Sequence, residues 1–301
     1  MREIPETPVK KILTVLIVLL LFSVPAGVFF LRSPVLVVTD ASFKQLYGSQ
    51  RSTVALVRNS LLLFRRLIPV PVSEQAGPDI IALVVERAFY SPHAVLFPKR
   101  YFEGARMYRD RKPGVPVLVM WGRNPLPQVF LQEPGIVFVR TDNAADLYRA
   151  GLAAAVLARE TGELLFFTDG SLQDQYRQAF GRGLRDQGFP GDPVYLDAFI
   201  DHAFYDGIGC VVLVGPATGF LEQNLEIPVI LFSWIDPART PRTVKILFDD
   251  SPLAQAAGAL RAFPAEGEIF LPSRAAVLSD RIEEREELRK LRALLRRSPA
   301  P

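Results

Sequence analysis

The sequence is poor in the residues that build disulfides and metal sites. It has one cysteine, Cys210, and two histidines, His93 and His202, in 301 residues. A single cysteine forms no internal disulfide, and its place in the apolar run Cys210–Val214 predicts a small buried hydrophobe. The cysteine content therefore does not distinguish an oxidising from a reducing cellular compartment. The histidines are far apart and lack the spacing of metal ligands, so we expect no metal site.

The signatures of common enzymes are also missing. The sequence has no Gly-Lys-Ser/Thr phosphate loop, no glycine-rich dinucleotide fingerprint after its first strand, and no serine elbow flanked by glycines. His202, beside Asp201, is a candidate general base, but no nucleophile or metal partner is identifiable for it. We expect a protein that is not an enzyme and that needs no cofactor.

No strong excess of one charge is present. The chain carries 35 basic and 32 acidic residues spread along its length, with a formal net charge of +3. This balance favours solubility and is not the footprint of a nucleic-acid-binding protein. With 49% hydrophobic residues, the chain is able to bury a substantial core in about two domains.

The N-terminus holds one long apolar run. Lys10 and Lys11 precede Ile12–Leu31, a nearly uncharged stretch of the length that a helix needs to cross a bilayer. Positive charge before the stretch predicts a cytoplasmic N-terminus and an exported body. A cleaved signal peptide is the alternative, because Val24–Ala26 places small residues near a cut site. We favour a retained single-pass anchor, since the apolar run continues to Leu31. No cysteine follows the segment, which excludes a lipid anchor there.

After Pro34, short runs rich in Val, Ile, Leu and Phe alternate with helical patterns. This alternation predicts an α/β fold of βαβ units with mostly parallel strands, and about ten strands fit two sheets in two lobes better than one sheet. The expected strands are Val35–Thr39, Leu67–Val72, Ala94–Phe97, Val115–Met120, Ile136–Val139, Leu164–Thr168, Val194–Ala198, Cys210–Val214, Pro228–Phe232 and Val244–Phe248. The expected helices are Phe43–Phe64, Asp79–Ala88, Arg100–Arg109, Ala144–Arg159, Gln173–Gln187 and Leu253–Phe263, with a C-terminal helix over Asp280–Arg297.

Proline-bearing segments suggest the domain boundaries. Prolines interrupt regular structure in 123–134 and again in 236–241. We predict a cytoplasmic tip and membrane segment in residues 1–33, lobe 1 in 34–138 and lobe 2 in 139–240. Residues 241–301 would then return to lobe 1, with the strand that begins at Val244, and end in the C-terminal helix. That helix has a narrow leucine stripe, which favours a solvated helix resting on the domain.

Polar and aromatic residues recur just after the predicted strands. In parallel α/β folds ligands collect at the carboxyl ends of strands, so these positions are the candidate binding residues. Capping of the following helix is an equally good explanation of each one alone, and turns always enrich Gly and Asp. Together the aromatic rings and carboxylates suit a flat polar ligand. From these positions we select Asp40, Phe43, Trp121, Asp169, Phe199, Gly219, Trp234 and Asp236.

Taken in order, these turns resemble the type I periplasmic binding proteins, and within them the basic membrane protein family of nucleoside receptors. Asp40–Gln45, read as Asp-Ala-Ser-Phe-Lys-Gln, is similar to that family's acidic turn followed by Ser-Phe-Asn-Gln. Val139–Gly151 looks like its stretch in which a tyrosine and an Ala-Gly pair open a long helix, and Asp197–Asp201 matches a strand-end phenylalanine with an acidic pair. The likeness covers most of Val35 to about Leu260.

The resemblance implies a two-lobed fold with a ligand between the lobes. It implies that Phe43 and Phe199 sandwich a base, that Asp40 bonds the polar edge of the ligand and that Gly219 lets the backbone approach it. Lys245 falls close to a lysine that the family places near its ligand. The chain departs from the family at Trp234, where the family has the first of two paired aspartates, with Asp236 in the second place; this departure puts nucleoside specificity in doubt.

Two functions of different kinds follow. The first is a membrane-anchored, extracytoplasmic solute-binding protein that takes a small polar or aromatic ligand, nucleoside-like by resemblance, and serves an ABC transporter permease or an envelope sensor by closing its lobes. The second is a binding-protein fold without ligand that acts as a structural or interaction component of the cell envelope, and Trp234 favours it modestly. An exported hydrolase would need a catalytic constellation, and a transcription regulator would need an N-terminal helix-turn-helix; neither is present in the sequence.

Overall fold

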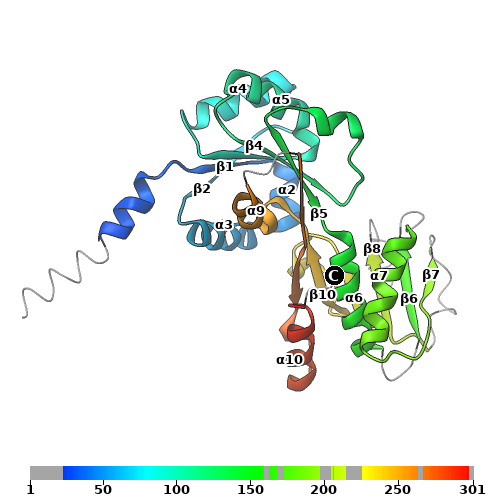
Figure 1. The fold of residues 1–301 in the computed structure, drawn as a ribbon. Helices are drawn as coiled ribbons and strands as arrows, with labels where there is room; N and C mark the ends of the chain where they lie inside the picture. The colour runs from blue at the N-terminus through cyan, green and yellow to red at the C-terminus, as the bar shows by residue number, and fades with distance from the viewer. Residues whose placement is uncertain are drawn as a thin grey trace, which may run out of the picture.

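The computed structural model describes residues 23–158, 163–168, 173–196, 205, 207–214, 226–263 and 267–297. Within them the chain forms two six-stranded sheets, which Figure 1 shows as two separate layers. The first sheet has the order β11-β5-β4-β3-β1-β2, and all of its strands are parallel. The second has the order β12-β10-β9-β8-β6-β7, and only β12 is antiparallel to its neighbour. The prediction of two mostly parallel sheets is confirmed.

The strands match the apolar runs of the sequence closely. The first sheet consists of β1 (Val35–Thr39), β2 (Leu67–Pro71), β3 (Ala94–Pro98), β4 (Val117–Gly122), β5 (Ile136–Thr141) and β11 (Gly267–Leu271). The second consists of β6 (Leu164–Thr168), β7 (Val194–Leu196), β8 (Cys210–Val214), β9 (Val229–Phe232), β10 (Val244–Asp249) and β12 (Arg274–Val277). The strands β11 and β12 are not predicted from the sequence, because both are edge strands with mixed, partly exposed residues.

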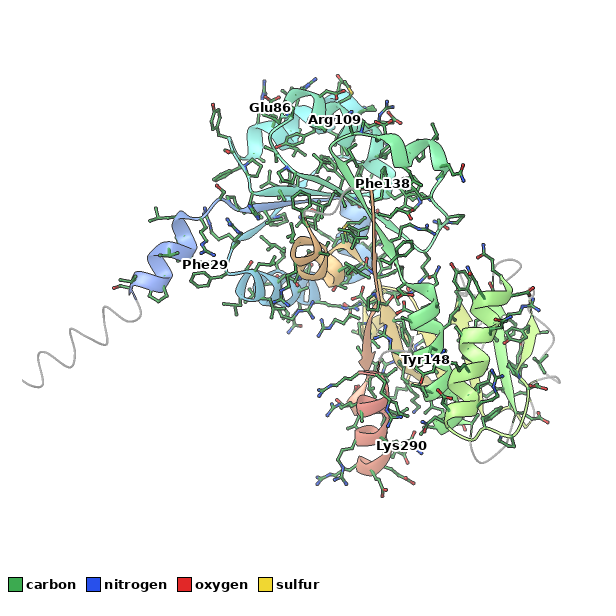
Figure 2. All side chains as sticks on the ribbon, viewed as in Figure 1. Phe29, Glu86, Arg109, Phe138, Tyr148 and Lys290 are labelled. Carbon is green, nitrogen blue, oxygen red and sulfur yellow. The ribbon has the colours of Figure 1, made fainter. Side chains whose placement is uncertain are left out.

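Alternating strand residues separate the two faces of each sheet. In the first sheet, Leu36 and Val38 face the helices α4 (Pro78–Ala88) and α5 (Phe102–Arg111), whereas Val35 and Val37 face α2 (Ala41–Tyr47), α3 (Ser49–Leu63) and α9 (Pro252–Ala262). Successive side chains of a strand point to opposite faces, so strands covered on both sides need unbroken apolar runs. This sheet with its five helices is lobe 1, and Phe138 marks its core in Figure 2.

The second sheet has helices α6 (Asn143–Leu157), α7 (Asp174–Asp186) and α10 (Arg285–Leu294) on one face. The apolar side chains of β6 and β8 on that face include Phe166 and Cys210, and both are fully buried. Leu291 and Leu294 of α10 are buried in the same cluster, so the C-terminal helix rests on lobe 2. This sheet with its three helices is lobe 2.

The chain crosses between the lobes three times. The crossings are short segments that follow β5, β10 and β11, and Figure 1 shows these strands leading from one lobe to the other at the centre of the molecule. The expected return to lobe 1 at Val244 is therefore corrected: β10 pairs with β9 in the second sheet, and the chain returns with α9 and β11. The apolar sequence of β10 fits either sheet. In the structure β10 pairs with β9, the preceding strand in the chain, as sequential strands commonly do.

The predicted membrane segment lies mostly outside the described residues. Residues 23–31 are helical, with Phe30 and Leu31 exposed. Within the part of the chain that the structure describes, no helix combines the length and the apolar character needed to cross a bilayer. The anchor stays a prediction.

Candidate functional site

A cleft of about 640 Å³ lies between the lobes, at the carboxyl ends of strands from both sheets. Lobe 1 contributes residues that follow β1, β3 and β4, lobe 2 contributes residues at the end of β9, and the crossing after β10 forms part of the wall. Parallel strands present their carboxyl ends at one edge, where helix starts leave free N–H groups. The cleft is lined by Asp40, Ser42, Phe43, Leu46, Pro98, Lys99, Arg100, Met120, Trp121, Gly122, Arg123, Asn124, Phe232, Ser233, Trp234, Asp250, Ser251 and Pro252.

Asp40 lies at one end of the cleft and is almost completely buried. One carboxylate oxygen accepts hydrogen bonds from the Phe43 N–H and the Ser42 hydroxyl, both at 2.7 Å, as the cap of α2. The other accepts from the Tyr101 hydroxyl at 2.9 Å, and Arg100 lies 3.3 Å away. Burial alone would raise the pKa of Asp40, but these donors and the Arg100 charge hold it below its ordinary value. Asp40 is ionised at neutral pH and already satisfied, so its main role is structural.

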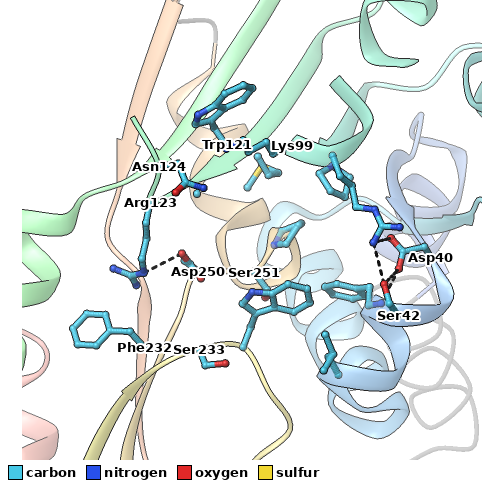
Figure 3. A pocket seen from close by; sticks show the side chains of 18 residues that line it. Asp40, Ser42, Lys99, Trp121, Arg123, Asn124, Phe232, Ser233, Asp250 and Ser251 are labelled. Carbon is cyan, nitrogen blue, oxygen red and sulfur yellow. Dashed lines mark hydrogen bonds and ion pairs between the residues drawn. The ribbon is translucent and has the colours of Figure 1, made fainter. Parts of the chain in front are cut away.

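Phe43 and Trp234 join the two lobes by stacking (Figure 3). The Trp234 ring, from the end of β9, lies 5.2 Å from the ring of Phe43 with an interplanar angle of 28°, and Tyr47 stacks on Phe43 at 5.1 Å. Only 4% of Phe43 is exposed. In this conformation a ligand ring has no free face of Phe43 to stack on, and Trp234 occupies the position that the resemblance gives to a base.

Trp121 forms another part of the cleft wall and is also buried. Its Nε1 donates to the Pro125 carbonyl at 3.1 Å, which fixes the ring. The Lys99 ammonium lies 4.7 Å from the ring centroid, a cation–π geometry. Within the described residues Lys99 forms no ion pair, so its charge is available to a ligand in the cleft.

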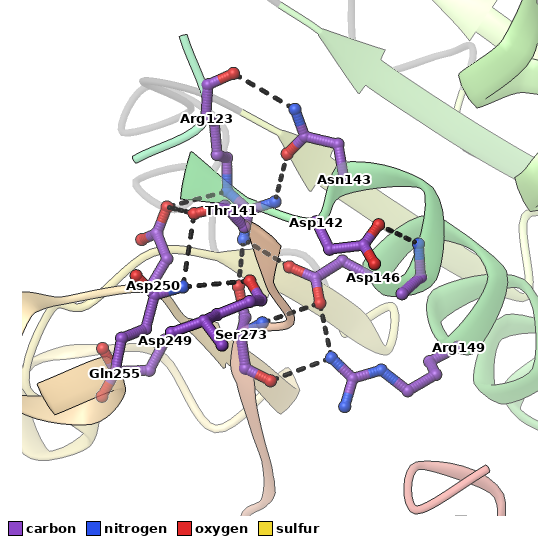
Figure 4. A network of polar contacts seen from close by, with 12 residues as sticks. Arg123, Thr141, Asp142, Asn143, Asp146, Arg149, Asp249, Asp250, Gln255 and Ser273 are labelled. Carbon is purple, nitrogen blue, oxygen red and sulfur yellow. Dashed lines mark hydrogen bonds and ion pairs between the residues drawn. The ribbon is translucent and has the colours of Figure 1, made fainter. Parts of the chain in front are cut away.

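A polar network ties the cleft floor to the three crossings (Figure 4). Arg123 contacts Asp250 at 3.2 Å, Asp146 at 3.0 Å and the Ser273 hydroxyl at 2.6 Å. Thr141, at the end of β5, donates to Asp250 at 3.3 Å. Each crossing thus places one residue of this network, and Arg123 joins them. Burial raises the pKa of Asp250, while the Arg123 charge opposes that rise.

The segment 233–239, which we call the latch segment, fastens lobe 2 to α2 and α3. Arg51 donates to the carbonyls of Trp234 at 3.1 Å and Ile235 at 2.7 Å and pairs with the buried Asp249 at 2.7 Å. The Asp236 N–H donates to the Leu46 carbonyl at 2.7 Å. These bonds stand beside the Phe43–Trp234 stack and hold the lobes together on this side of the cleft.

The latch segment also explains why the predicted helix Phe43–Phe64 is broken. Gly48 ends α2 with φ of 84°, a conformation that residues with a side chain rarely adopt. A Cβ on Gly48 would overlap the carboxylate of Asp236. The glycine therefore lets lobe 2 approach lobe 1 closely at this point.

The predicted site residues have different outcomes. Asp40, Phe43, Trp121 and Trp234 line the cleft together. Asp236 instead caps a short 3₁₀ turn in the latch segment by accepting from the Ala238 N–H. Lys245 does not line the cleft: it lies near the start of β10 and donates to the Arg281 carbonyl, away from the carboxyl ends of the strands. Asp169, Phe199 and Gly219 lie outside the described residues.

Sequence reasoning missed several cleft residues that obey the same rule. Lys99 and Arg100 directly follow β3, and Asp250 and Ser251 directly follow β10. Reading the positions after every predicted strand, including the last, would have found them. Arg123 also follows a strand, but its partners come from crossings far along the chain, so its role had no local signal.

The walls of the cleft offer several contacts to a polar solute. These come from aromatic rings, the Lys99 ammonium, an exposed Asn124 and the Ser233 hydroxyl. Among the described residues, no three His, Cys, Asp or Glu side chains gather closely enough to hold a metal ion. The thiol of Cys210 is fully buried, and burial raises its pKa.

The two sheets, the three crossings and the cleft between them define the fold of the type I periplasmic binding proteins. The structure is similar to an ABC transporter solute-binding protein from Conexibacter woesei, with a TM-score of 0.57 and 11% identity over 87% of this chain and 94% of that chain. It is also similar to a transcriptional activator of the comK gene from Bacillus halodurans, with a TM-score of 0.52 and 12% identity over 89% and 100%. No protein-family model and no curated protein matches the sequence. At these identities the similarity shows the fold alone.

Proposed function

We propose that this chain is an extracytoplasmic solute-binding protein, held to the membrane by its N-terminal apolar segment, that binds a small polar solute between its lobes. The observation that carries the proposal is the interlobe cleft of about 640 Å³ with aromatic and charged walls. Its size lies in the range of small-molecule sites. The fold, which one similar structure shares as an ABC transporter solute-binding protein, supports delivery to a transporter permease or an envelope sensor.

The solute would use the side of the cleft that Trp234 leaves free. Lys99 and Asn124 offer an ammonium and an amide there. A nucleoside, the class that the resemblance implies, would bind with its base against the outer face of Trp234 or in place of it. A polar solute without a ring needs no such displacement.

One observation favours a second function, a structural or interaction component of the cell envelope that has no ligand. Trp234 already stacks on Phe43, and the latch segment joins the lobes without any solute present. Under this alternative the closed form would be the only form.

A thermal-shift screen of the full chain separates the two functions. The panel holds nucleosides, bases, sugars and amino acids, tested on the wild type, on Trp234→Ala and on Lys99→Ala. Binding to the folded state alone at a hundred times Kd stabilises it by about 2.7 kcal/mol, which raises Tm measurably. We expect at least one class to raise Tm of the wild type and to lose most of its effect in Lys99→Ala, while Lys290→Ala, on α10, keeps it.

A panel that shifts neither the wild type nor Trp234→Ala, in proteins that melt cooperatively, would support the ligandless function. A response to nucleosides in Trp234→Ala alone would mean that Trp234 excludes rings from the wild-type cleft. That result would keep the binding fold and remove nucleosides as the natural solute.

A further inference from the structure

The outer face of α3 carries an apolar row that the described residues leave largely exposed. Val54, Val57 and Leu61 are 60%, 54% and 68% exposed and lie one turn apart. Ala55 and Asn59, on the opposite face of the helix, are buried against lobe 1. A surface helix ordinarily shows polar residues on the side away from its core. This helix instead shows apolar side chains there.

The apolar surface continues past the end of α3. Leu62 is half exposed, and the ring of Phe64 contacts that of Phe29 at 5.7 Å. Phe29 belongs to the helical residues 23–31, in which Phe30 is 61% and Leu31 88% exposed. Figure 2 shows Phe29 beside the end of α3, where residues 23–31 leave lobe 1. One apolar surface therefore runs from α3 to residues 23–31, which continue the apolar run that begins at Ile12.

The charge of the same region is one-sided. Residues 23–72 contain six basic residues and a single acidic one, Asp40, which is buried and paired with Arg100. Within the described part of the chain, five of the six have no acidic partner: Arg32, Lys44, Arg58, Arg65 and Arg66. Arg32 lies over the Phe64 ring at 5.3 Å, so positive charge borders the apolar surface at the end of α3. The rest of the chain balances its charges, whereas residues 23–72 do not.

Apolar side chains bordered by basic ones are the composition of helices that lie in the headgroup region of anionic bilayers. Each basic residue near such a surface contributes about 1 kcal/mol of attraction. The position of this face in the chain indicates that a lipid bilayer covers it. The face adjoins the apolar segment whose sequence fits a membrane span. A second protein molecule would be favoured by a mixed charge pattern, which is absent from residues 23–72.

We propose that the outer face of α3, together with residues 23–32, lies on the surface of an anionic lipid bilayer and holds lobe 1 against it. Val54, Val57 and Leu61 enter the headgroup region, and the arginines meet lipid phosphates. Val54, Val57 and Leu61 all belong to lobe 1, so the contact sets lobe 1 rather than lobe 2 on the membrane. The proposal does not depend on whether the cleft binds a solute.

A local probe tests this contact even if the N-terminal segment anchors the protein by itself. The full chain carries the environment-sensitive dye NBD on Val57→Cys or Leu61→Cys, and the native Cys210 is fully buried and does not compete for the dye. The matched control is Arg87→Cys on α4, which is exposed on the other side of the first sheet. Each protein is reconstituted in vesicles of phosphatidylcholine with or without phosphatidylglycerol, and in some vesicles the lipids bear a nitroxide quencher.

We expect the dye at positions 57 and 61 to shift its emission to the blue in anionic vesicles and to lose most of it to the lipid-borne quencher. The dye at position 87 should do neither. Salt at 1 M shortens the Debye length to about 3 Å and should weaken the effect. Emission at 57 that stays like that at 87 would overturn the proposal. A blue shift without lipid quenching that persists in detergent and grows with protein concentration would overturn it in favour of a second copy of the chain.

Discussion

The buried carboxylate of Asp40 links α2 to the residues that follow β3. It caps α2 through the Phe43 N–H, accepts from the Tyr101 hydroxyl and lies beside Arg100. Hydrogen bonds to a charged, buried acceptor are about twice as strong as neutral ones. Asp40 therefore stabilises the shape of the cleft, whichever solute the cleft holds.

This role predicts a characteristic pH dependence. Because the folded pKa of Asp40 is lowered from its ordinary 3.8, its contribution to stability is fully present above pH 3.8 and is lost as the pH falls through the folded value. Asp40→Asn should cost about 1–3 kcal/mol of unfolding free energy at neutral pH. Urea unfolding at pH 7 and near pH 3 should show the difference between wild type and variant shrinking in acid. A difference that is independent of pH would contradict the assignment.

At the scale of elements, α6 and α7 approach each other backbone to backbone. Gly151 and Gly183 lie against each other, and a Cβ on Gly183 would overlap the Tyr148 carbonyl oxygen. Backbone atoms line both sides, so no side chain is able to move away. This close approach seats α7 on lobe 2, and α6 begins directly after the first crossing.

Gly183→Ala should therefore destabilise the protein by about 1–3 kcal/mol through overpacking. The control is Gly181→Ala in the same helix, where the new Cβ meets only the end of the Arg185 side chain. Alanine is favoured over glycine in a helix by about 1 kcal/mol, so the control should be neutral or stabilising. Chemical denaturation of both variants checks the prediction, and equal losses in the two would disprove the backbone contact.

At the scale of the whole molecule, the lobes are joined in two ways. The three crossings and their Arg123 network form one joint, and the latch segment with Arg51 forms the other. A protein joined only by its crossings opens about them. Opening of this protein also requires the Arg51 bonds and the Phe43–Trp234 stack to separate.

Arg51→Met should loosen the latch segment and leave Asp249 buried without its charge partner. Removal of one member of a buried pair costs about 3 kcal/mol, whereas the surface pair removed in the control Arg111→Met contributes under about 1 kcal/mol. Spin labels on Arg87→Cys and Lys290→Cys, one on each lobe, should show a broader and longer distance distribution in Arg51→Met than in Arg111→Met. Identical distributions would mean that the crossings alone hold the lobes.

The sequence predicts the elements of this fold better than the path of the chain. Strands buried on both faces, such as Cys210–Val214, are unbroken apolar runs, and ten of the twelve strands in the described residues are predicted from the sequence. The path of the chain is harder to predict: β10 has the same apolar character as strands of either sheet, and β11 and β12 are edge strands with mixed, partly exposed residues. Sequence reasoning placed Asp40, Phe43, Trp121 and Trp234 at one site, because strand ends share an edge. It missed the contacts of Arg51 with Asp249 and of Arg123 with Ser273, since these partners are over a hundred residues away.

Trp234 acts as an intramolecular competitor of aromatic solutes for the face of Phe43. A group on a short tether acts at an effective concentration in the millimolar range. A dissolved ring that needs the face of Phe43 binds only during the fraction of time that Trp234 is away, and its apparent Kd rises by the inverse of that fraction. Solutes that contact Lys99 and Asn124 instead do not compete with Trp234. The Phe43–Trp234 stack would thus make the cleft selective. Polar solutes would bind at low concentration, whereas aromatic solutes would bind only when they are abundant or bind very tightly.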